Sequence, residues 1–368
     1  MPYKFCALPS YPAECDVWDI LKAERRPIVV YGMGNGADKL LRRFASLGIE
    51  VADFFASDGF VRGHSFHGKR VKSFSEIKAE YPDFVIVLSF ATNRGEVIEM
   101  LREIDAEYEL FVPDMPVVGD EYFDREYFNN HYAEIEKAYS LLEDEESRSL
   151  YAAVINYRLS GKLSYIIDEY SEKSELYSLI KSDKEIRTVV DAGAYNGDTV
   201  RDVLSEIPQI ERIYAFEPDR RNYKKLEKYR EEDARVIAIN AAVYSETATG
   251  YINASGNRNT SIESSSYEHK SAEVAFVRID EAVPSCDYIK YDVEGAELPA
   301  LIGSESLINK SRPVLLVSLY HKSGDIFSLP LYLDAAHPGY RYYLRRLRSI
   351  PAWELDLVML PVDKKFGM

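Results

Sequence analysis

Short apolar runs alternate with helical patterns in two stretches of the chain. In the first stretch, residues 27–31, 51–56 and 84–88 are largely apolar runs of strand length. The segment after the first run has apolar side chains three and four residues apart and ends at Gly48, which is typical of a helix. This alternation predicts a small parallel sheet covered by helices over residues 27–116.

The alternation returns at residue 187 and continues to the end of the chain. Five runs have the length of buried parallel strands: 188–191, 212–217, 236–240, 288–292 and 313–319. Two extended runs follow, 340–347 and 353–360, with no helical pattern between them, so we expect an antiparallel hairpin. The predicted fold class is α/β: a Rossmann-like sheet with a terminal hairpin, preceded by a smaller Rossmann-like α/β domain.

Residues 117–186 connect these stretches and show a different pattern. Apolar side chains recur at helical spacing from Tyr132 to Leu142, and Asp144 is placed to cap a second helix that Gly161 ends. The stretch holds 16 acidic and 8 basic residues, so we expect a solvated helical bridge. Its tyrosines leave open a homodimer contact. The predicted division is an N-terminal segment (1–26), a small Rossmann-like domain (27–116), a helical bridge (117–186) and a C-terminal domain (187–368).

Charge and composition narrow the classes of function. The net charge of −16 disfavours a general nucleic-acid binder, because an acidic surface repels phosphate backbones. No apolar run approaches the roughly 20 residues needed to span a bilayer, and the first residues lack the apolar stretch of a signal peptide. Three cysteines without a CxxC pair suit a reducing compartment. We therefore expect a cytoplasmic protein without a membrane or nucleic-acid partner.

A glycine-containing turn follows the run at 188–191. Small residues let a ligand approach the backbone, and the next helix offers unpaired N–H groups. Asp191 would repel a diphosphate, so it suits a cationic or zwitterionic ligand such as the amino-acid end of S-adenosylmethionine. The predicted cofactor-binding residues of this turn are Asp191, Gly193, Ala194, Tyr195, Asn196, Gly197, Asp198 and Thr199.

The ends of the next two predicted strands supply further cofactor candidates. Glu217, followed by Pro218, comes 26 residues after Asp191. A carboxylate at this strand end of a doubly wound fold accepts hydrogen bonds from a ribose diol; the alternative is an exposed acidic residue at a turn. Asn240 and Ala241 are candidates for an adenine slot, with a purely structural role equally open.

Three carboxylates, Asp292, Glu294 and Glu297, lie at and just beyond the end of the fourth predicted strand. Like charges at the ligand edge of a sheet are costly unless a cation, a base role or a ligand hydroxyl compensates. Glu294 and Glu297 are substrate-binding candidates, but they also suit the start of the next helix. Asp292, still on the strand, is the stronger candidate for cofactor binding and catalysis.

Residues 187–368 resemble the FkbM-type S-adenosylmethionine-dependent methyltransferases. The motifs that carry the resemblance are Asp191-Ala192-Gly193-Ala194 with Gly197-Asp198-Thr199, Phe216-Glu217-Pro218, the run Ile289 to Glu297, and Val317 to Lys322 with Asp325. The resemblance implies a class I methyltransferase fold, S-adenosylmethionine as the cofactor, and methyl transfer. The acceptor it implies is usually a hydroxyl of a sugar, polysaccharide or natural product.

A hydroxyl acceptor must lose its proton, and His321 at the fifth strand end is the predicted base, because an imidazole titrates near neutrality. Asp292 is its partner or an alternative base. A metal-assisted variant with Asp292, Glu294 and His321 as ligands is less favoured, and no metal is predicted. Arg345 belongs to a group of hairpin arginines that could hold an anionic acceptor; the alternative is that they keep the sheet edge soluble.

The N-terminal turn Gly32-Met33-Gly34-Asn35-Gly36-Ala37, with Asp58 at the next strand end, has the pattern of a nucleotide-binding turn. It either binds a nucleotide or nucleotide sugar, or belongs to a structural and oligomerisation module. An alternative function for the chain is a nucleotide-binding protein whose C-terminal domain binds S-adenosylmethionine without catalysis. A dehydrogenase is a third and weaker alternative.

Overall fold

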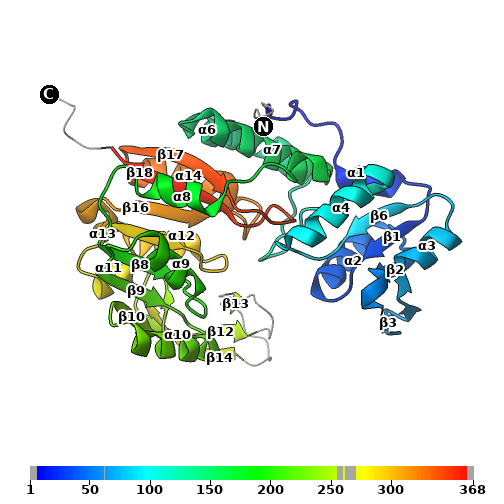
Figure 1. Cartoon of the computed structure of the whole chain (residues 1–368). Coiled ribbons are helices and arrows are strands. Elements are labelled where there is room, and N and C mark those ends of the chain that lie inside the picture. The colour runs from blue at the N-terminus through cyan, green and yellow to red at the C-terminus, as the bar shows by residue number, and fades with distance from the viewer. Residues whose placement is uncertain (1–5, 62, 255–259, 262–270, 363–368) are drawn as a thin grey trace.

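The chain folds around two β-sheets that a pair of helices spans (Figure 1). This computed structural model describes residues 6–61, 63–254, 260–261 and 271–362. The segment after β6 touches the C-terminal hairpin through an isolated bridge between Thr92 and Ile350. A second bridge pairs Phe111 with Lys162 of the connecting segment. Within the described residues, no helix combines the length and apolar character that crossing a membrane requires.

The N-terminal sheet has five strands in the order β5-β2-β1-β6-β7, and all its pairs are parallel. Its strands are β1 (Ile28–Tyr31), β2 (Asp53–Ala56), β5 (Lys72–Ser73), β6 (Val85–Leu88) and β7 (Glu109–Phe111). The accompanying elements are α1 (Val17–Ala23), α2 (Asn35–Leu47), α3 (Phe74–Glu80), α4 (Gly95–Glu107), a 3-10 turn at Asp58–Phe60 and the hairpin β3 (Ser65–Phe66) and β4 (Lys69–Arg70). The predicted parallel α/β arrangement is confirmed here, and Gly48 ends α2 in the left-handed conformation.

The C-terminal sheet has seven strands in the order β10-β9-β8-β15-β16-β18-β17. Its strands are β8 (Thr188–Ala192), β9 (Arg212–Phe216), β10 (Val236–Ile239), β15 (Tyr288–Tyr291), β16 (Val314–Ser318), β17 (Tyr340–Arg346) and β18 (Leu355–Pro361). The first five are parallel, whereas β18 runs antiparallel to both β16 and β17. The predicted fold class and the terminal hairpin are confirmed, and the second strand of the hairpin lies inside the sheet.

Helices cover this sheet and form the connection before it. Around the sheet lie α9 (Asp198–Glu206), α10 (Arg220–Glu232), α11 (Ile279–Ala282), α12 (Glu297–Ile302), α13 (Glu305–Ser311) and α14 (Asp325–Ala336). The connection holds α5 (Arg125–Asn130), α6 (Tyr132–Leu141), α7 (Glu145–Ser160), a 3-10 turn at Leu163–Tyr165, and α8 (Lys173–Ile180).

The expectation of a solvated bridge is wrong for α7. Asp144 caps the helix through the Ser147 amide and Gly161 ends it, as predicted. Eleven of its sixteen residues are buried, however, and among them are Tyr151 and Tyr157. The helix packs against β17, and its acidic residues Glu145 and Glu146 both lie in its first turn. These two tyrosines are therefore core residues and offer no dimer surface.

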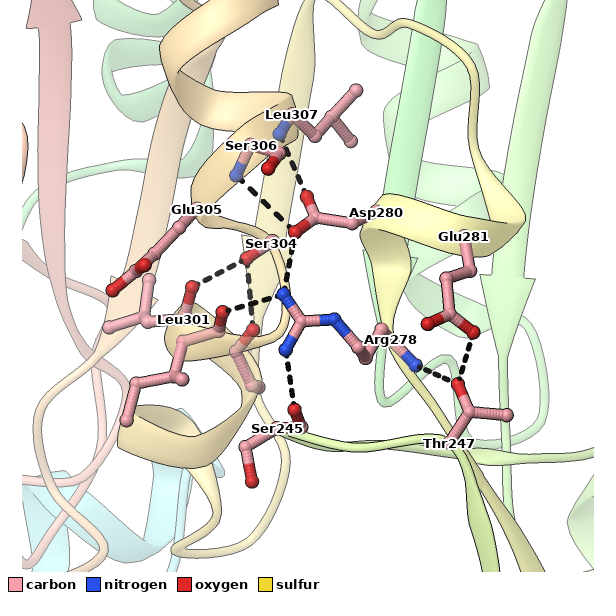
Figure 2. A network of polar contacts seen from close by, with 12 residues as sticks. Ser245, Thr247, Arg278, Asp280, Glu281, Leu301, Ser304, Glu305, Ser306 and Leu307 are labelled. Atoms are coloured by element: carbon pink, nitrogen blue, oxygen red, sulfur yellow. Dashed lines mark hydrogen bonds and ion pairs between the residues drawn. The ribbon is translucent and has the colours of Figure 1, made fainter.

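A four-stranded sheet between β10 and α11 is absent from the predictions. It has the order β11-β14-β12-β13 and consists of β11 (Ala242–Val243), β12 (Ala248–Ala254), β13 (Thr260–Ser261) and β14 (Ser271–Val277). Figure 2 shows how Arg278 ties it to the main domain by donating to the Ser245 carbonyl at 2.6 Å and to Asp280 at 2.8 Å. Asp280 in turn accepts the Leu307 amide of α13 at 2.8 Å. This network joins the small sheet to α11 and α13.

Candidate functional site

The predicted site residues gather at one edge of the seven-stranded sheet. Asp191 is the last residue but one of β8. Glu217, Asn240 and Asp292 directly follow their strands, and His321 comes three residues after β16. Because these five strands are parallel and in register, their carboxyl ends form a single edge. This is the edge at which open α/β sheets bind ligands.

The turn after β8 requires glycine at position 193. Gly193 has φ +92°, and a Cβ atom there would lie 1.8 Å from the carbonyl oxygen of Asp292. Gly197 (φ +83°) begins α9 without a side-chain cap, so amides at the start of this helix face the turn. Tyr195, with φ +47°, is 39% exposed beside them. The turn thus brings the ends of β8 and β15 together and leaves an aromatic ring and helix amides at the edge.

Asp191 is a buried carboxylate with an unused oxygen. One oxygen accepts the Thr199 hydroxyl at 2.5 Å. The other, Oδ1, is buried without a hydrogen-bond partner among the described residues and lies 3.9 Å from Lys290 Nζ. Burial raises the pKa of Asp191, although Lys290 and Thr199 act in the opposite direction. A buried acceptor without a partner is costly, so a donor from a ligand would stabilise it.

Glu217 is a second buried carboxylate, and its partners are backbone amides. It is 6% exposed and accepts the Asp219 amide at 2.8 Å. Burial raises its pKa to about 7, and within the described part of the chain no cation pairs with it. Asn240 donates its side-chain amide to the carbonyls of Glu217 (2.8 Å) and Pro218 (3.2 Å), so it holds the two strand ends together.

His321 stands at the centre of a second group of charges. Its side chain is 1% exposed, and Nδ1 lies 2.9 Å from Glu297. Nε2 lies 3.5 Å from Asp292 and 3.6 Å from Glu294. Burial alone would lower the pKa of His321, but the three carboxylates raise it to about 10. The carboxylates therefore favour the protonated ring, in contrast to the expectation of an imidazole that titrates near neutrality.

The three carboxylates around His321 differ in their surroundings. Asp292 accepts from Lys290 at 2.9 Å and from the Tyr320 hydroxyl at 3.2 Å, and these cations and donors hold its pKa below the usual value despite its burial. Glu297 is the first residue of α12 and accepts the Val293 and Gly295 amides, so the helix-start alternative is confirmed for it.

Glu294 is the carboxylate of the group that solvent reaches most. Its side chain is 36% exposed, against 25% for Asp292 and 1% for Glu297. It lies before α12 in a turn and has φ +51°, a conformation that is strained for a residue with a Cβ. Burial raises its pKa to about 7. The helix-start alternative is therefore wrong for Glu294.

Arg345 does not join this edge, which corrects its prediction as an acceptor ligand. Its guanidinium lies 2.7 Å from Asp144 and 3.2 Å from Glu146, and it donates to the Ser147 hydroxyl at 2.9 Å. Arg345 is 7% exposed, and its ion pairs fix the start of α7 to β17. Arg346 is also buried and donates to backbone carbonyls.

The metal-assisted alternative has no ligand set to rest on. Over the described ranges, no group of three or more His, Cys, Asp or Glu side chains has an arrangement that could hold a metal ion. The carboxylates near His321 are instead tied to the ring, to Lys290 and to backbone amides.

Lys290 and Tyr320 are site residues that the sequence reasoning missed. Burial alone would lower the pKa of Lys290, but Asp292 and Asp191 raise it above its usual value. The ammonium of Lys290 thus lies near both carboxylates, 3.9 Å from Asp191 and 2.9 Å from Asp292. A signal was present in the sequence: a lysine inside the apolar run Tyr288–Tyr291 needs a buried partner.

Comparisons with known proteins agree with this geometry. Residues 191–347 match the family model described as a methyltransferase FkbM domain, which confirms the resemblance for these residues. The chain is similar to the methyltransferase FkbM from Methylobacillus flagellatus KT, with a TM-score of 0.67 and 18% identity over 96% of this chain and 94% of that chain. At this identity the likeness shows a shared fold, the N-terminal part included.

Two other solved structures are similar over about half of the chain. One is an rRNA methylase from Streptococcus thermophilus (TM-score 0.34, 12% identity, 52% of this chain and 94% of that chain). The other is Aeropyrum pernix fibrillarin with natively bound S-adenosyl-L-methionine (TM-score 0.31, 13% identity, 51% of this chain and 73% of that chain). These scores are too low to support an argument. No curated protein matches the chain.

Proposed function

Because the chain carries a methyltransferase FkbM domain at residues 191–347, we propose that it transfers a methyl group from S-adenosylmethionine to a hydroxyl of a sugar, polysaccharide or natural product. The burial of Glu217 is the observation that supports this most. Glu217 is a buried carboxylate at the second strand end, next to the glycine turn, and no cation of the described residues pairs with it. A ribose diol offers two hydroxyl donors to such a carboxylate.

Residues of β8, β9 and the turn between β8 and α9 fit the cofactor. Glu217 would accept from the ribose hydroxyls, and the free Oδ1 of Asp191 would accept from the amino group. Gly193 gives the backbone the close approach to β15 on which the turn depends. When bound, the cofactor supplies an electrophilic methyl group on a sulfonium, so the chain has to orient the acceptor and remove its proton.

On the acceptor side we assign the proton of the hydroxyl to Glu294, with His321 and Asp292 as its charged neighbours. The carboxylates around His321 raise the pKa of its ring, and Nδ1 lies 2.9 Å from Glu297, which disfavours the predicted role as a base at neutral pH. Asp292 is engaged by Lys290 and Tyr320. Glu294 is the most exposed of the three carboxylates, and its pKa of about 7 suits proton transfer near neutrality.

The test is a calorimetric titration of the full chain with S-adenosylhomocysteine, in wild type and in Glu217→Ala. We expect saturable one-to-one binding in the wild type and a loss of at least about 100-fold in the variant, because two charge-assisted hydrogen bonds are removed. Asp58→Ala is the matched control, since Asp58 follows the corresponding strand of the N-terminal sheet. No binding by the wild type at millimolar ligand, or equal affinities in all three proteins, would contradict the proposal.

A further inference from the structure

A short segment of the N-terminal half touches both chain segments that carry the acceptor-side charges. Residues 116–118 lie between β7 and α5. The Val118 amide donates to the His321 carbonyl at 2.9 Å. The Val118 side chain packs against Gly295, where an added Cβ would lie 3.2 Å from it. Gly295 follows Glu294 directly, so Val118 contacts the turn of Glu294 and the loop of His321 at once.

Lys39 of α2 holds this segment from the other side. Its ammonium donates to the carbonyls of Pro116 at 3.0 Å and Val117 at 2.8 Å. Lys39 is half-buried, and burial lowers its pKa. Among the described residues no carboxylate lies within ion-pair distance of it. Its donors therefore serve the two consecutive carbonyls that precede the Val118 amide.

The His321 loop has a second tie to the N-terminal half. The buried Arg158 of α7 donates to the Ser323 carbonyl at 3.0 Å and lies 3.3 Å from Asp114. The Ser323 hydroxyl donates to the Glu121 carbonyl at 2.6 Å. These contacts hold the loop after residue 321, whereas Lys39 acts on the residue itself through Val118.

We infer that Lys39 is a positioning residue: through residues 116–118 it fixes His321 against Glu297 and the Glu294 turn, so that the N-terminal half completes the acceptor side of the site. This inference rests on the proposed function only in calling that side the acceptor side. It assigns the N-terminal α/β unit a role in the methyltransferase site that requires no ligand at the Gly32–Gly36 turn.

The consequence appears in the charge state of His321. Glu297, Asp292 and Glu294 face the ring, and Tyr320, Lys322, Asp325, Lys290 and Glu354 lie around it. If Val118 loosens, the 2.9 Å approach of Nδ1 to Glu297 lengthens while the ring stays buried. A longer distance weakens the attraction between the charged ring and Glu297, and burial still disfavours the charged form. The midpoint of the His321 titration should therefore fall.

The experiment is a pH titration of the six histidine rings by NMR in the ring-labelled full chain, with His321 assigned from His321→Gln. We expect a midpoint near 10 in the wild type, a fall of at least about one pH unit in Lys39→Met, and a return to the wild-type value in Lys39→Arg. Lys69→Met is the matched control, because Lys69 also donates to two consecutive carbonyls, those of Val51 and Ala52, far along the chain from this segment.

An unchanged His321 midpoint in Lys39→Met, or an equal shift in Lys69→Met, would overturn the inference. If Lys39→Met fails to fold, Val118→Gly decides, because it removes both Val118 atoms that lie against Gly295 and keeps the amide; an unchanged midpoint there would also overturn it. S-adenosylhomocysteine affinity, measured on the same samples, should stay within about twofold. Failure of the wild type to bind that ligand would contradict the proposed function while leaving the His321 result readable.

Discussion

Among its described residues the chain contains two strand–glycine–helix turns, and their carboxylates differ in burial: Asp191 and Glu217 are buried, whereas Asp58 is exposed. At the C-terminal turn, and as far as the described residues go, Asp191 keeps a buried oxygen without a hydrogen-bond partner and Glu217 accepts from backbone amides. At the N-terminal turn, the carboxylate in the matching place is Asp58, which is exposed and accepts both the amide and the hydroxyl of Ser75. The same backbone pattern therefore occurs beside buried carboxylates in one half and beside an exposed carboxylate, held by Ser75, in the other.

The glycines of the two turns share a packing role. A Cβ at Gly36 would lie 2.0 Å from the Ser89 carbonyl, much as one at Gly193 would meet the Asp292 carbonyl at 1.8 Å. At Gly32 it would meet the ring of Phe90 at 2.7 Å. Glycine at such a turn thus reports how closely two strands approach, and the state of the neighbouring carboxylate indicates whether a ligand fits.

The largest effect expected from this comparison comes from an added methyl group at each turn. Gly193→Ala and Gly36→Ala should each destabilise the fold by roughly 3 kcal/mol or more, because a carbonyl has to move. Only Gly193→Ala should also abolish S-adenosylhomocysteine binding. Urea unfolding and calorimetry on the same samples measure both effects. Loss of binding in Gly36→Ala, at a temperature where it is folded, would break the comparison.

A smaller effect concerns the pH dependence of cofactor affinity. A hydroxyl donates to ionised Glu217, so protonation should weaken binding. With a pKa of about 7 in the free protein, the affinity for S-adenosylhomocysteine should fall roughly tenfold between pH 8 and pH 6. The dependence should vanish in Glu217→Gln and persist in Asp58→Asn. A flat profile in the wild type would mean that Glu217 is not the ribose acceptor.

The sequence predicted the sheets well because their evidence is local. The runs at 188–191 and 288–292 have the length of buried strands, and the small residues after residue 191 are consistent with a close turn, so the placement of both strand ends at the ligand edge followed from parallel pairing. The small sheet of residues 242–277 was missed, since Gly250 and the polar positions of β12 give no clear alternation. The fold class could be predicted because the core strands are clear apolar runs of strand length.

The charge partners could not be predicted, because they are far apart in the sequence. Arg345 pairs with Asp144 across 201 positions, and Lys39 reaches carbonyls 77 and 78 positions away. His321 was identified as a site residue, but its charge depends on three carboxylates that converge only in the folded chain. Residue type thus indicated which groups take part in chemistry, whereas their protonation and their partners required the structure.

The smallest expected effect is on the free energy of unfolding: neutralising one strand-end carboxylate, Glu217, should stabilise the fold, whereas neutralising the other, Asp58, should destabilise it. Burial raises the folded-state pKa of Glu217 from 4.5 to about 7, so the folded chain binds this proton more tightly, and stability falls as pH rises through that window. At pH 8 Glu217→Gln should therefore stabilise the fold by about 1 kcal/mol, since the burial cost of the charge outweighs the weakened amide contacts.

Asp58 has a pKa below its usual value because Ser75 donates to it. Its ionised form stabilises the fold above pH 4 or so, and Asp58→Asn should slightly destabilise it. Thermal melting at pH 8 without ligand compares the two variants. Destabilisation by Glu217→Gln would show that its carboxylate serves the fold, as Asp58 does, and would remove the contrast on which its assignment to the cofactor depends.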